Sequence, residues 1–149
     1  MPVFIATDHR GFDLKNRLVE YLQEKNIRIE DFGNYKLDPE DDFPDFAQKV
    51  AQAVQQNPDE NIGIVICGSG IGVSIAVNRF KNIRCGIALN EEQVQHGREN
   101  DHTNILAIPA DYADFETAKK YVDIFLATRP KMVDKYLRRA KKIDTIPVQ

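Results

Sequence analysis

Polar and apolar positions along the chain follow two periods, that of a strand and that of a helix. Val3–Ala6, Ile83–Leu89 and Asn104–Ile108 are short strand candidates, and Ile62–Cys67 is continuously apolar, which is typical of a strand covered on both faces. Ile27–Phe32 alternates instead, which is typical of a strand at a sheet edge. The pattern therefore predicts five strands.

Helical spacing fills the segments between these strands. The apolar faces are marked by Leu14, Leu18, Tyr21 and Leu22; Phe46, Val50, Ala53 and Val54; Val73, Ala76, Val77 and Phe80; Phe115, Ala118, Val122, Phe125 and Leu126; and Met132, Val133, Tyr136, Leu137 and Ala140. A polar helical stretch, Glu91–Glu99, precedes the last strand, and Pro130 separates the last two helices.

Strand and helix in alternation predict right-handed βαβ units and an α/β fold class. We expect a three-layer, Rossmann-like fold with a mostly parallel five-stranded sheet and an extra C-terminal helix. The chain shows no internal repeat and no linker, so residues 1–149 are expected to form a single domain.

Composition narrows the function classes. The net charge of −3 gives no sign of a nucleic-acid partner, and no apolar run approaches the ~20 residues of a membrane span. The first residues lack the basic and apolar regions of a signal peptide. Both cysteines, Cys67 and Cys85, lie in apolar runs, which is typical of a reducing compartment, so we expect a cytoplasmic protein.

Charge is uneven along the chain. An acidic stretch contains Asp38, Glu40, Asp41, Asp42 and Asp45, and the C-terminal region carries Arg129, Lys131, Lys135, Arg138, Arg139, Lys141 and Lys142. Two solvated faces would explain both, and an anion held by the basic end would explain the second.

A glycine-rich loop is the strongest candidate for chemistry. Ile62–Cys67 runs directly into Cys67-Gly68-Ser69-Gly70-Ile71-Gly72, at the end of a strand where ligands bind in such folds. Glycines let backbone N–H groups converge, and the following helix adds partial positive charge. Such a loop can hold a phosphate or a developing oxyanion, although a tight structural turn has the same pattern.

Cys67 ends the strand beside these glycines. A thiol there feels the following helix terminus, which favours the thiolate and suits a base or nucleophile. A small buried residue is the alternative interpretation, and it is the one we adopt for Cys85.

Two further polar segments flank predicted strands. Asp8 and His9 follow the first strand and are expected at the same sheet edge as Cys67, where the acid could orient the imidazole or tune its proton affinity. A turn residue followed by an exposed histidine is the alternative interpretation. Asn100, Asp101 and His102 precede another strand. His102 could carry a proton and the other two could bind hydroxyls, or all three could form a polar turn. His96 is assigned no role.

Several motifs are missing. Three scattered histidines and two separated cysteines match no metal-ligand spacing. The glycine loop lies on the third strand with no acidic residue ~20 positions later, so it is not a dinucleotide fingerprint. It lacks the Lys-Ser/Thr of a P-loop, and no serine-nucleophile motif is present.

Three segments, by order and spacing, carry a resemblance to a known family. They are Thr7-Asp8-His9-Arg10-Gly11-Phe12, Cys67-Gly68-Ser69-Gly70-Ile71-Gly72-Val73-Ser74-Ile75-Ala76 with Asn78 beyond, and Thr103-Asn104-Ile105-Leu106-Ala107. From Val3 to about Ile143 the chain resembles the type B ribose-5-phosphate isomerases and the galactose-6-phosphate isomerase subunits. Phe43-Pro44-Asp45-Phe46 stands where this family often has an aromatic-proline segment.

The resemblance implies an isomerase that moves a carbonyl between C1 and C2 of an aldose phosphate, without a metal or organic cofactor. Cys67 would take the C2 proton, and the N–H groups of the five residues Gly68, Ser69, Gly70, Ile71 and Gly72 would stabilise the enediolate. Asp8 and His9 would contact the sugar and its phosphate.

The resemblance also implies a small-molecule phosphosugar as partner and a homodimer or homotetramer whose sites are completed by a neighbouring subunit. Lys135 and Arg139 match the basic positions of the C-terminal helix that hold phosphate. Ribose 5-phosphate and ribulose 5-phosphate are the expected pair of sugars.

The chain departs from the family pattern at three places. Asn100 stands where a ring-opening histidine is usual, with Asp101 and His102 after it. Asp111 stands where an arginine is common, and Lys135 replaces a second arginine, keeping the charge but not the bidentate fork. With Asn100 unable to titrate, two histidines remain near the predicted sheet edge. His9 beside Asp8 is the preferred ring-opening group, and His102 is the alternative.

Other functions stay open at this point. The chain could isomerise a different phosphosugar, or be a weakly active sugar-phosphate-binding subunit that needs a partner chain. A nucleotide-binding regulatory domain is a third possibility, which the fingerprint mismatch disfavours.

Overall fold

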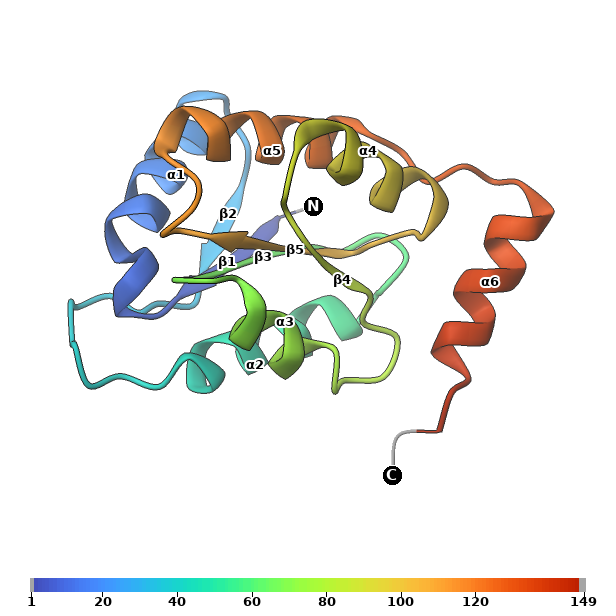
Figure 1. Ribbon diagram of the computed structural model, residues 1–149, viewed down its shortest axis with the longest axis horizontal. Helices are drawn as coiled ribbons and strands as arrows, with labels where there is room; N and C mark the ends of the chain where they lie inside the picture. Colours follow the sequence, from blue (N-terminus) through green and yellow to red (C-terminus); the bar gives the residue numbers. More distant parts are fainter. Residues whose placement is uncertain (1, 148–149) are drawn as a thin grey trace.

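The computed structural model describes residues 2–147, in which a parallel sheet lies between two layers of helices (Figure 1). The strands are β1 (Val3–Thr7), β2 (Ile29–Asp31), β3 (Ile62–Cys67), β4 (Cys85–Ile87) and β5 (Ile105–Pro109). Their order in the sheet is β2-β1-β3-β5-β4, and every neighbouring pair is parallel. The five-stranded α/β sheet is thus confirmed, with β2 at an edge as its alternating sequence predicted.

Within residues 2–147, six α-helices and one short 3₁₀ helix connect and follow the strands. They are η1 (His9–Gly11), α1 (Phe12–Glu24), α2 (Phe43–Gln55), α3 (Ile71–Val77), α4 (Glu91–Asn100), α5 (Phe115–Ala127) and α6 (Asp134–Asp144). Helices α1, α4 and α5 cover one face of the sheet, and α2 and α3 cover the other (Figure 1). Helix α6 is the extra C-terminal helix.

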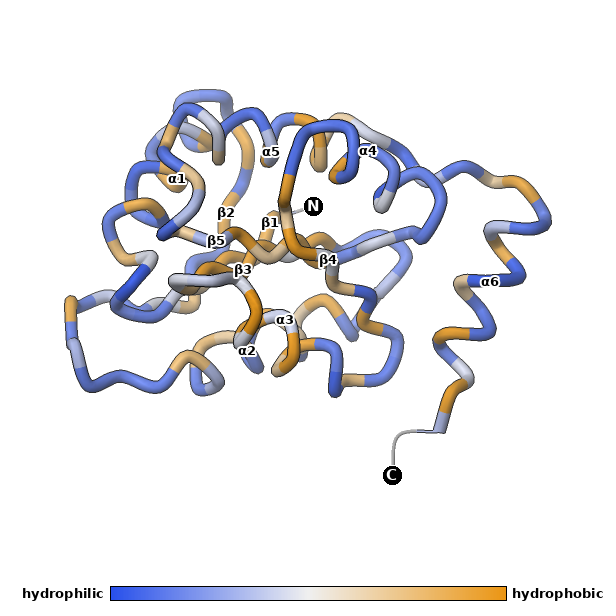
Figure 2. Tube along the Cα trace, viewed as in Figure 1, coloured by the Kyte–Doolittle hydropathy of each residue, from blue (hydrophilic) through white to orange (hydrophobic). Residues whose placement is uncertain are grey.

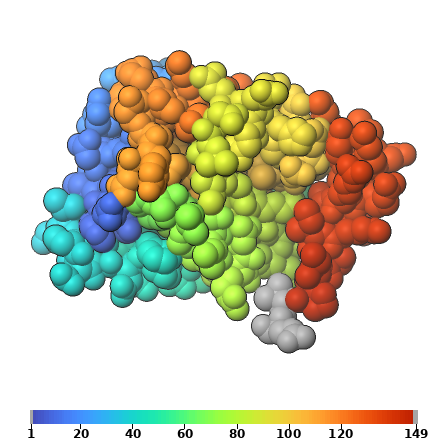
Figure 3. Space-filling model, in the orientation of Figure 1, coloured from blue at the N-terminus to red at the C-terminus, as the bar shows by residue number. Residues whose placement is uncertain are grey.

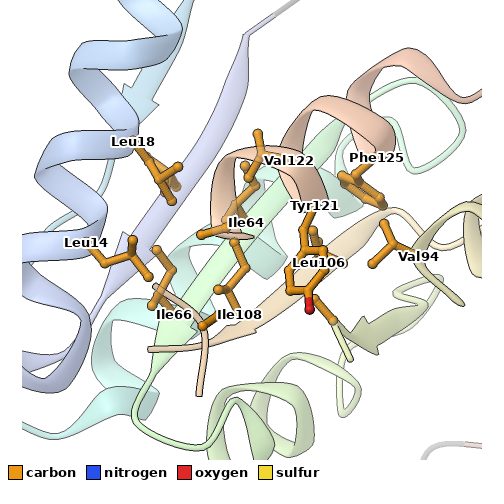
Figure 4. Close-up of a cluster of buried hydrophobic side chains, with 14 of the residues drawn as sticks. Leu14, Leu18, Ile64, Ile66, Val94, Leu106, Ile108, Tyr121, Val122 and Phe125 are labelled. Atoms are coloured by element: carbon orange, nitrogen blue, oxygen red, sulfur yellow. The ribbon is translucent and has the colours of Figure 1, made fainter. Parts of the chain in front are cut away.

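The two faces of β3 show why its sequence is apolar throughout. Ile64 and Ile66 pack against α1 and α5, where Leu18 and Val122 close the core (Figure 4). Val65 and Cys67, which alternate with them, belong to the second cluster, against α2 and α3. The strands are accordingly the most hydrophobic part of the trace in Figure 2, and the outward helix faces are polar. Cys67 therefore lies at the end of a fully buried strand.

The edge strands are shorter than the sequence predicted. The run Ile83–Leu89 contributes only Cys85–Ile87 to the sheet, so Cys85 begins β4 and is not in the middle of it. Asparagine side chains accept hydrogen bonds from the backbone N–H groups at the start of β4. Asn104 Oδ1 accepts one from Arg84 N–H at 2.9 Å, and Asn78 Oδ1 accepts one from Cys85 N–H at 2.8 Å. Local polar side chains thus compete with the ladder at this edge.

The C-terminal helix also starts later than its apolar spacing predicted. Met132 lies outside α6, Val133 is only its N-terminal flanking residue, and α5 ends at Ala127, before Pro130. Both Met132 and Val133 are exposed, so their apolar character reflects no packing within one chain. Helix α6 stands beyond the amino ends of the strands (Figure 1).

Candidate active site

The site lies at the carboxyl ends of the neighbouring strands β1 and β3, whose following helices lie on opposite faces of the sheet. The connection from β1 goes to one face of the sheet through α1, and that from β3 goes to the other through α3. Such a switch point opens a crevice between the two following loops. Asp8 N–H reaches Ile66 O at 3.4 Å and Thr7 Oγ1 donates to the same oxygen at 3.1 Å, which places the start of η1 beside Cys67.

The glycine loop is held at its base and leaves donors free above it. Ala110 N–H donates to Cys67 O and Asp111 N–H donates to Gly68 O, both at 2.9 Å. In the described part of the chain, the N–H groups of Gly68, Ser69 and Gly70 donate to no intramolecular acceptor. Gly70 has φ +73°, a left-handed conformation that L side chains rarely adopt. The loop can therefore receive an anion at its backbone.

The two cysteines have different surroundings, as their sequence positions suggested. Cys67 is 5% exposed and closes β3 at the loop. Cys85 lies on edge strand β4, and burial of its thiol raises its pKa to about 12, which leaves it protonated at neutral pH. Neither cysteine forms a disulfide. Cys67 is thus the thiol available at the sheet edge.

Asp8 and His9 do reach the edge beside Cys67, but they are not partners of each other. Asp8 is buried, and its carboxylate accepts hydrogen bonds from the backbone N–H groups of Arg10 and Gly11. Burial raises the pKa of Asp8, partly offset by these bonds. His9 Nδ1 instead lies 2.6 Å from Asp41 Oδ1, and this hydrogen bond raises the pKa of His9. The expectation that Asp8 orients His9 is wrong.

Residues 34–43 form a wall of the site that the sequence analysis did not place there. Asn34 N–H donates to Thr7 O at 2.8 Å and its side chain reaches Asp41 Oδ2 at 2.9 Å. Phe43 lies against Gly72, where an added Cβ would meet the ring at 2.7 Å. The acidic stretch was interpreted as a solvated face, and the aromatic-proline segment after it was the only signal of a site role.

A charged pair lies over the glycine loop. Arg10 and Asp111 form an ion pair, and an added Cβ on Gly68 would meet the Asp111 carboxylate at 2.8 Å and the Arg10 guanidinium at 3.2 Å. Although Asp111 stands where an arginine is common in the family, a cation is still present at this edge, because Asp111 pairs with Arg10. The two residues are 101 positions apart in the chain, so the local sequence could not predict this ion pair.

The remaining predicted site residues lie at the opposite end of the sheet. Asn100 and Asp101 end α4, and His102 precedes β5, so all three are at the amino ends of the strands. The expectation that His102 lies near the same edge as His9 is wrong, because strand direction puts the residues before β5 far from those after β1. His102 is buried, with Nε2 3.1 Å from Lys131 O.

Lys135 and Arg139 share this far end. Both are exposed on α6, which Figure 3 shows in red at one end of the molecule, with the blue N-terminal segment at the other. The helix is anchored by Arg84, whose Nη1 lies 2.7 Å from Asp144 Oδ2. Within one chain, these two cations do not approach Cys67.

Asp8, His9 and Asp41 also bring ligand atoms within 4.8 Å of one another, a grouping the sequence spacing did not reveal. Their geometry does not fit a cation. Asp41 Oδ1 and His9 Nδ1 are at hydrogen-bond distance, and Asp8 is occupied by two backbone donors. An ion between them would have to break these bonds.

A cavity of about 350 Å³ adjoins the loop on its other side. Its lining includes Ser69 and Ile71 from the loop, with Leu89, Tyr112 and Tyr121, but neither Cys67, Asp8 nor His9. Ile71, Leu89 and Tyr112 are exposed apolar residues. This lining suits an apolar side chain better than a phosphorylated ligand.

Within residues 2–147, the helices are all too short or too polar to cross a bilayer.

Comparison with known proteins gives one consistent family. Residues 3–146 match the model of the family described as Ribose/Galactose Isomerase. The chain is similar to the ribose-5-phosphate isomerase B of Escherichia coli strain K12, with 36% identity over 127 residues, 85% of this chain and 84% of that protein. It is also 37% identical over 125 residues to the probable ribose-5-phosphate isomerase B of Mycoplasma pneumoniae, covering 84% and 82%.

Solved structures agree with these relatives. Ribose-5-phosphate isomerase B from Mycoplasma genitalium, with bound ribulose-5-phosphate, superposes with a TM-score of 0.92 at 35% identity, covering 96% of this chain and 93% of that one. The Thermotoga maritima ribose 5-phosphate isomerase superposes with a TM-score of 0.91 at 38% identity, over 97% and 98% of the two chains.

Proposed function

The chain belongs to the ribose/galactose isomerase family, and on that premise we propose that it interconverts ribose 5-phosphate and ribulose 5-phosphate. The relatives make it an aldose–ketose isomerase of sugar phosphates. The pair of sugars, the base and the intermediate are the proposed parts. The single observation that carries them is Cys67 at the end of β3, beside a loop whose Gly68, Ser69 and Gly70 N–H groups meet no acceptor among residues 2–147.

The reaction needs a base at C2 and a partner for the charge on O1. The Cys67 thiolate removes the C2 proton of the open aldose, and the C–H electrons form a C1–C2 double bond as the carbonyl oxygen becomes an enediolate oxygen. N–H groups of the Gly68–Gly72 loop donate to that oxygen, which stabilises the intermediate and the transition state leading to it. Return of that proton to C1, together with transfer of the O2 hydroxyl proton to O1, gives the ketose and regenerates the thiolate.

The ring must open before this step, because ribose 5-phosphate is mostly a closed furanose. The anomeric hydroxyl loses a proton, the bond between C1 and the ring oxygen breaks, and the ring oxygen gains a proton. An imidazole can perform both transfers in turn. His9 is the group we propose, since it lies at the Cys67 edge with its side chain 29% exposed, while His102 is buried.

A second copy of the chain would complete each site. Asn100, Asp101, Lys135 and Arg139 lie too far from Cys67 to act in their own chain, so their proposed roles in binding the sugar and its phosphate require a neighbour. Exposed apolar residues near the loop and on α6 support association, among them Ile71, Ile75, Leu89, Leu137 and Ile143. We propose a homo-oligomer that works in the cytoplasm without a metal or organic cofactor.

An assay of the purified protein tests the proposal. Ribose 5-phosphate should be converted to ribulose 5-phosphate with a higher kcat/KM than other pentose and hexose phosphates, and unphosphorylated ribose should be a far poorer substrate. Preference for another phosphosugar would move the assignment within the family. Binding of ribose 5-phosphate without turnover would favour a binding subunit that needs a different partner chain.

A further inference from the structure

Asp41, from the acidic stretch, lies in the site but has no role in the proposed reaction. We propose that Asp41 is a positioning residue that holds His9 in the tautomer and orientation needed for ring opening. This inference rests on the proposed function, in which His9 moves protons between the anomeric hydroxyl and the ring oxygen.

Asp41 makes three hydrogen bonds with its two oxygens. Oδ1 accepts from the backbone N–H of His9 at 3.1 Å and lies 2.6 Å from His9 Nδ1. Oδ2 accepts from Asn34 Nδ2 at 2.9 Å. The side chain of Asp41 is 4% exposed, so these partners replace nearly all of its water. The carboxylate is thus fixed to the first residue of η1 and to the loop that begins at Asn34.

These contacts determine which nitrogen of His9 is available to substrate. Because Asp41 only accepts, Nδ1 must carry a hydrogen, and in the neutral ring Nε2 is then the basic atom. Nε2 has no protein partner within the described residues. The side chain of His9 is 29% exposed, which leaves that atom accessible from solvent. His9 therefore presents Nε2 as a base when neutral and as an acid when protonated.

The charges around His9 strengthen this arrangement. Asp41 from the 34–42 loop and Asp8 from the end of β1 favour the imidazolium, and Arg10 in η1 opposes it. Burial alone would raise the pKa of Asp41, but hydrogen bonds from Asn34 and His9 outweigh it and lower that pKa. Asp41 therefore stays ionised while His9 gains and loses its proton.

The proton balance of the step is simple. Neutral His9 takes the proton of the anomeric hydroxyl at Nε2, the C1–O4 bond breaks as the carbonyl forms, and the imidazolium returns its proton to O4. Asp41 keeps its charge throughout and stabilises the imidazolium between the two transfers, as a buried carboxylate does for other catalytic histidines.

An amide cannot replace the carboxylate. All three partners of Asp41 are donors, so an amide at position 41 must turn its NH₂ toward Asn34 or toward His9. Asp41→Asn is therefore the informative variant, and Glu40→Gln is its matched control. Glu40 is exposed in the same loop, and its replacement removes the same charge without contact to His9.

The kinetic test separates ring opening from the enediolate step. Ribulose 5-phosphate cannot close a furanose, because its C5 oxygen carries the phosphate, so solvent deuterium uptake at its C1 reports the Cys67 step alone. In the intact enzyme, Asp41→Asn should lower kcat for ribose 5-phosphate by about 10- to 100-fold and leave the exchange rate within twofold. His9→Gln should show the same split, and the double variant should lose no more than His9→Gln alone.

A proton NMR titration of His9 gives a readout that does not depend on activity. The pKa of His9 should fall in Asp41→Asn and stay unchanged in Glu40→Gln. Equal losses of turnover and exchange, additive losses in the double variant, or an unchanged His9 titration would each overturn the proposal. A wild-type protein without isomerase activity would refute the proposed function and the ring-opening role with it, while the titration would still decide whether Asp41 holds His9.

Discussion

At the scale of single residues, the two cysteines differ in what surrounds their sulfur atoms. Cys67 ends a buried strand at the glycine loop, and burial keeps the Cys85 thiol protonated. Cys67→Ala should lower kcat by about 10²- to 10⁴-fold with a smaller effect on KM, since a base acts in the transition state. Steady-state kinetics measures both constants.

Cys85→Ala serves as the control for that substitution. It removes the same group, a cysteine thiol, from edge strand β4 and should leave turnover within about twofold. Near-normal turnover in Cys67→Ala would assign the C2 proton to another group.

The His9–Asp41 pair also predicts how stability depends on pH. The pKa of His9 is raised above 6.5, so its contribution is full below that pH and is lost as the pH rises through the folded value. The pKa of Asp41 is lowered from 3.8, so its contribution is present above that pH and is lost as the pH falls through the folded value. The Tm difference between wild type and Asp41→Asn should therefore be largest between pH 4 and 6.5.

Measurement of that difference across pH 3 to 9 checks the window. The Tm of Glu40→Gln should follow that of the wild type throughout. A Tm difference that grows above pH 8 would contradict the proposed pairing of His9 and Asp41, because that pairing loses its contribution as His9 loses its proton.

At the scale of elements, the turn from β3 into α3 depends on a left-handed residue. Gly70 has φ +73°, and an added Cβ would lie 3.3 Å from Pro109 N. Gly70→Ala should lower the free energy of unfolding by about 1–2 kcal/mol and reduce kcat, because the N–H groups of the loop shift with it.

Gly86→Ala is the matched substitution for Gly70→Ala. It adds the same methyl group to edge strand β4, where the nearest atom is at an ordinary 3.4 Å and φ is not positive. Denaturant unfolding should show little change for Gly86→Ala. Equal losses in both variants would show that the left-handed turn has no special role.

The sequence predicted the elements whose bounds depend on their own pattern of apolar residues. The central strand Ile62–Cys67 matches its predicted bounds because both its faces are buried, which makes its pattern continuous. Edge strand β4 was overestimated, since side chains of Asn78 and Asn104 take hydrogen bonds that a ladder would otherwise use. Met132 and Val133 were assigned to a helix by an apolar spacing that no packing in one chain supports.

The candidate site was predictable where it follows strand ends and not where it depends on pairing across the fold. Strand direction gave the common edge of Asp8, His9 and Cys67, and the same rule, not applied to His102, would have put that residue at the other end. Asp41 was hidden in an acidic run because charge alone does not distinguish a solvated carboxylate from one that is 4% exposed.

At the scale of the whole molecule, the proposed site residues divide between the two ends of the sheet. Cys67 and His9 are at one end, and Lys135 and Arg139 are at the other. The Lys135→Ala, Arg139→Ala double variant should raise KM for ribose 5-phosphate by about 10-fold or more and change kcat less, because two charge-assisted contacts to phosphate are lost. An unchanged KM would make α6 only a solvated basic face.

Mixing two impaired variants tests whether sites are shared between copies. Cys67→Ala and the Lys135→Ala, Arg139→Ala variant each lack one half of the site, so mixed oligomers should regain one intact site. At a ribose 5-phosphate concentration well below KM, the two variants unfolded and refolded together should be several-fold more active than the average of the two refolded alone. Absence of rescue, with mixed oligomers demonstrated by native mass spectrometry, would mean that the halves do not meet across an interface.

The position of α6, remote from the loop of its own chain, has a consequence for dosage. A single chain would carry the Cys67 part of one site and the α6 part of another, so catalysis would require two chains to associate. At chain concentrations well below the dissociation constant for self-association, the rate would rise with the square of the amount of chain, since the paired form is then the scarce species. A cell that makes half as much of this chain would then keep only a quarter of its activity.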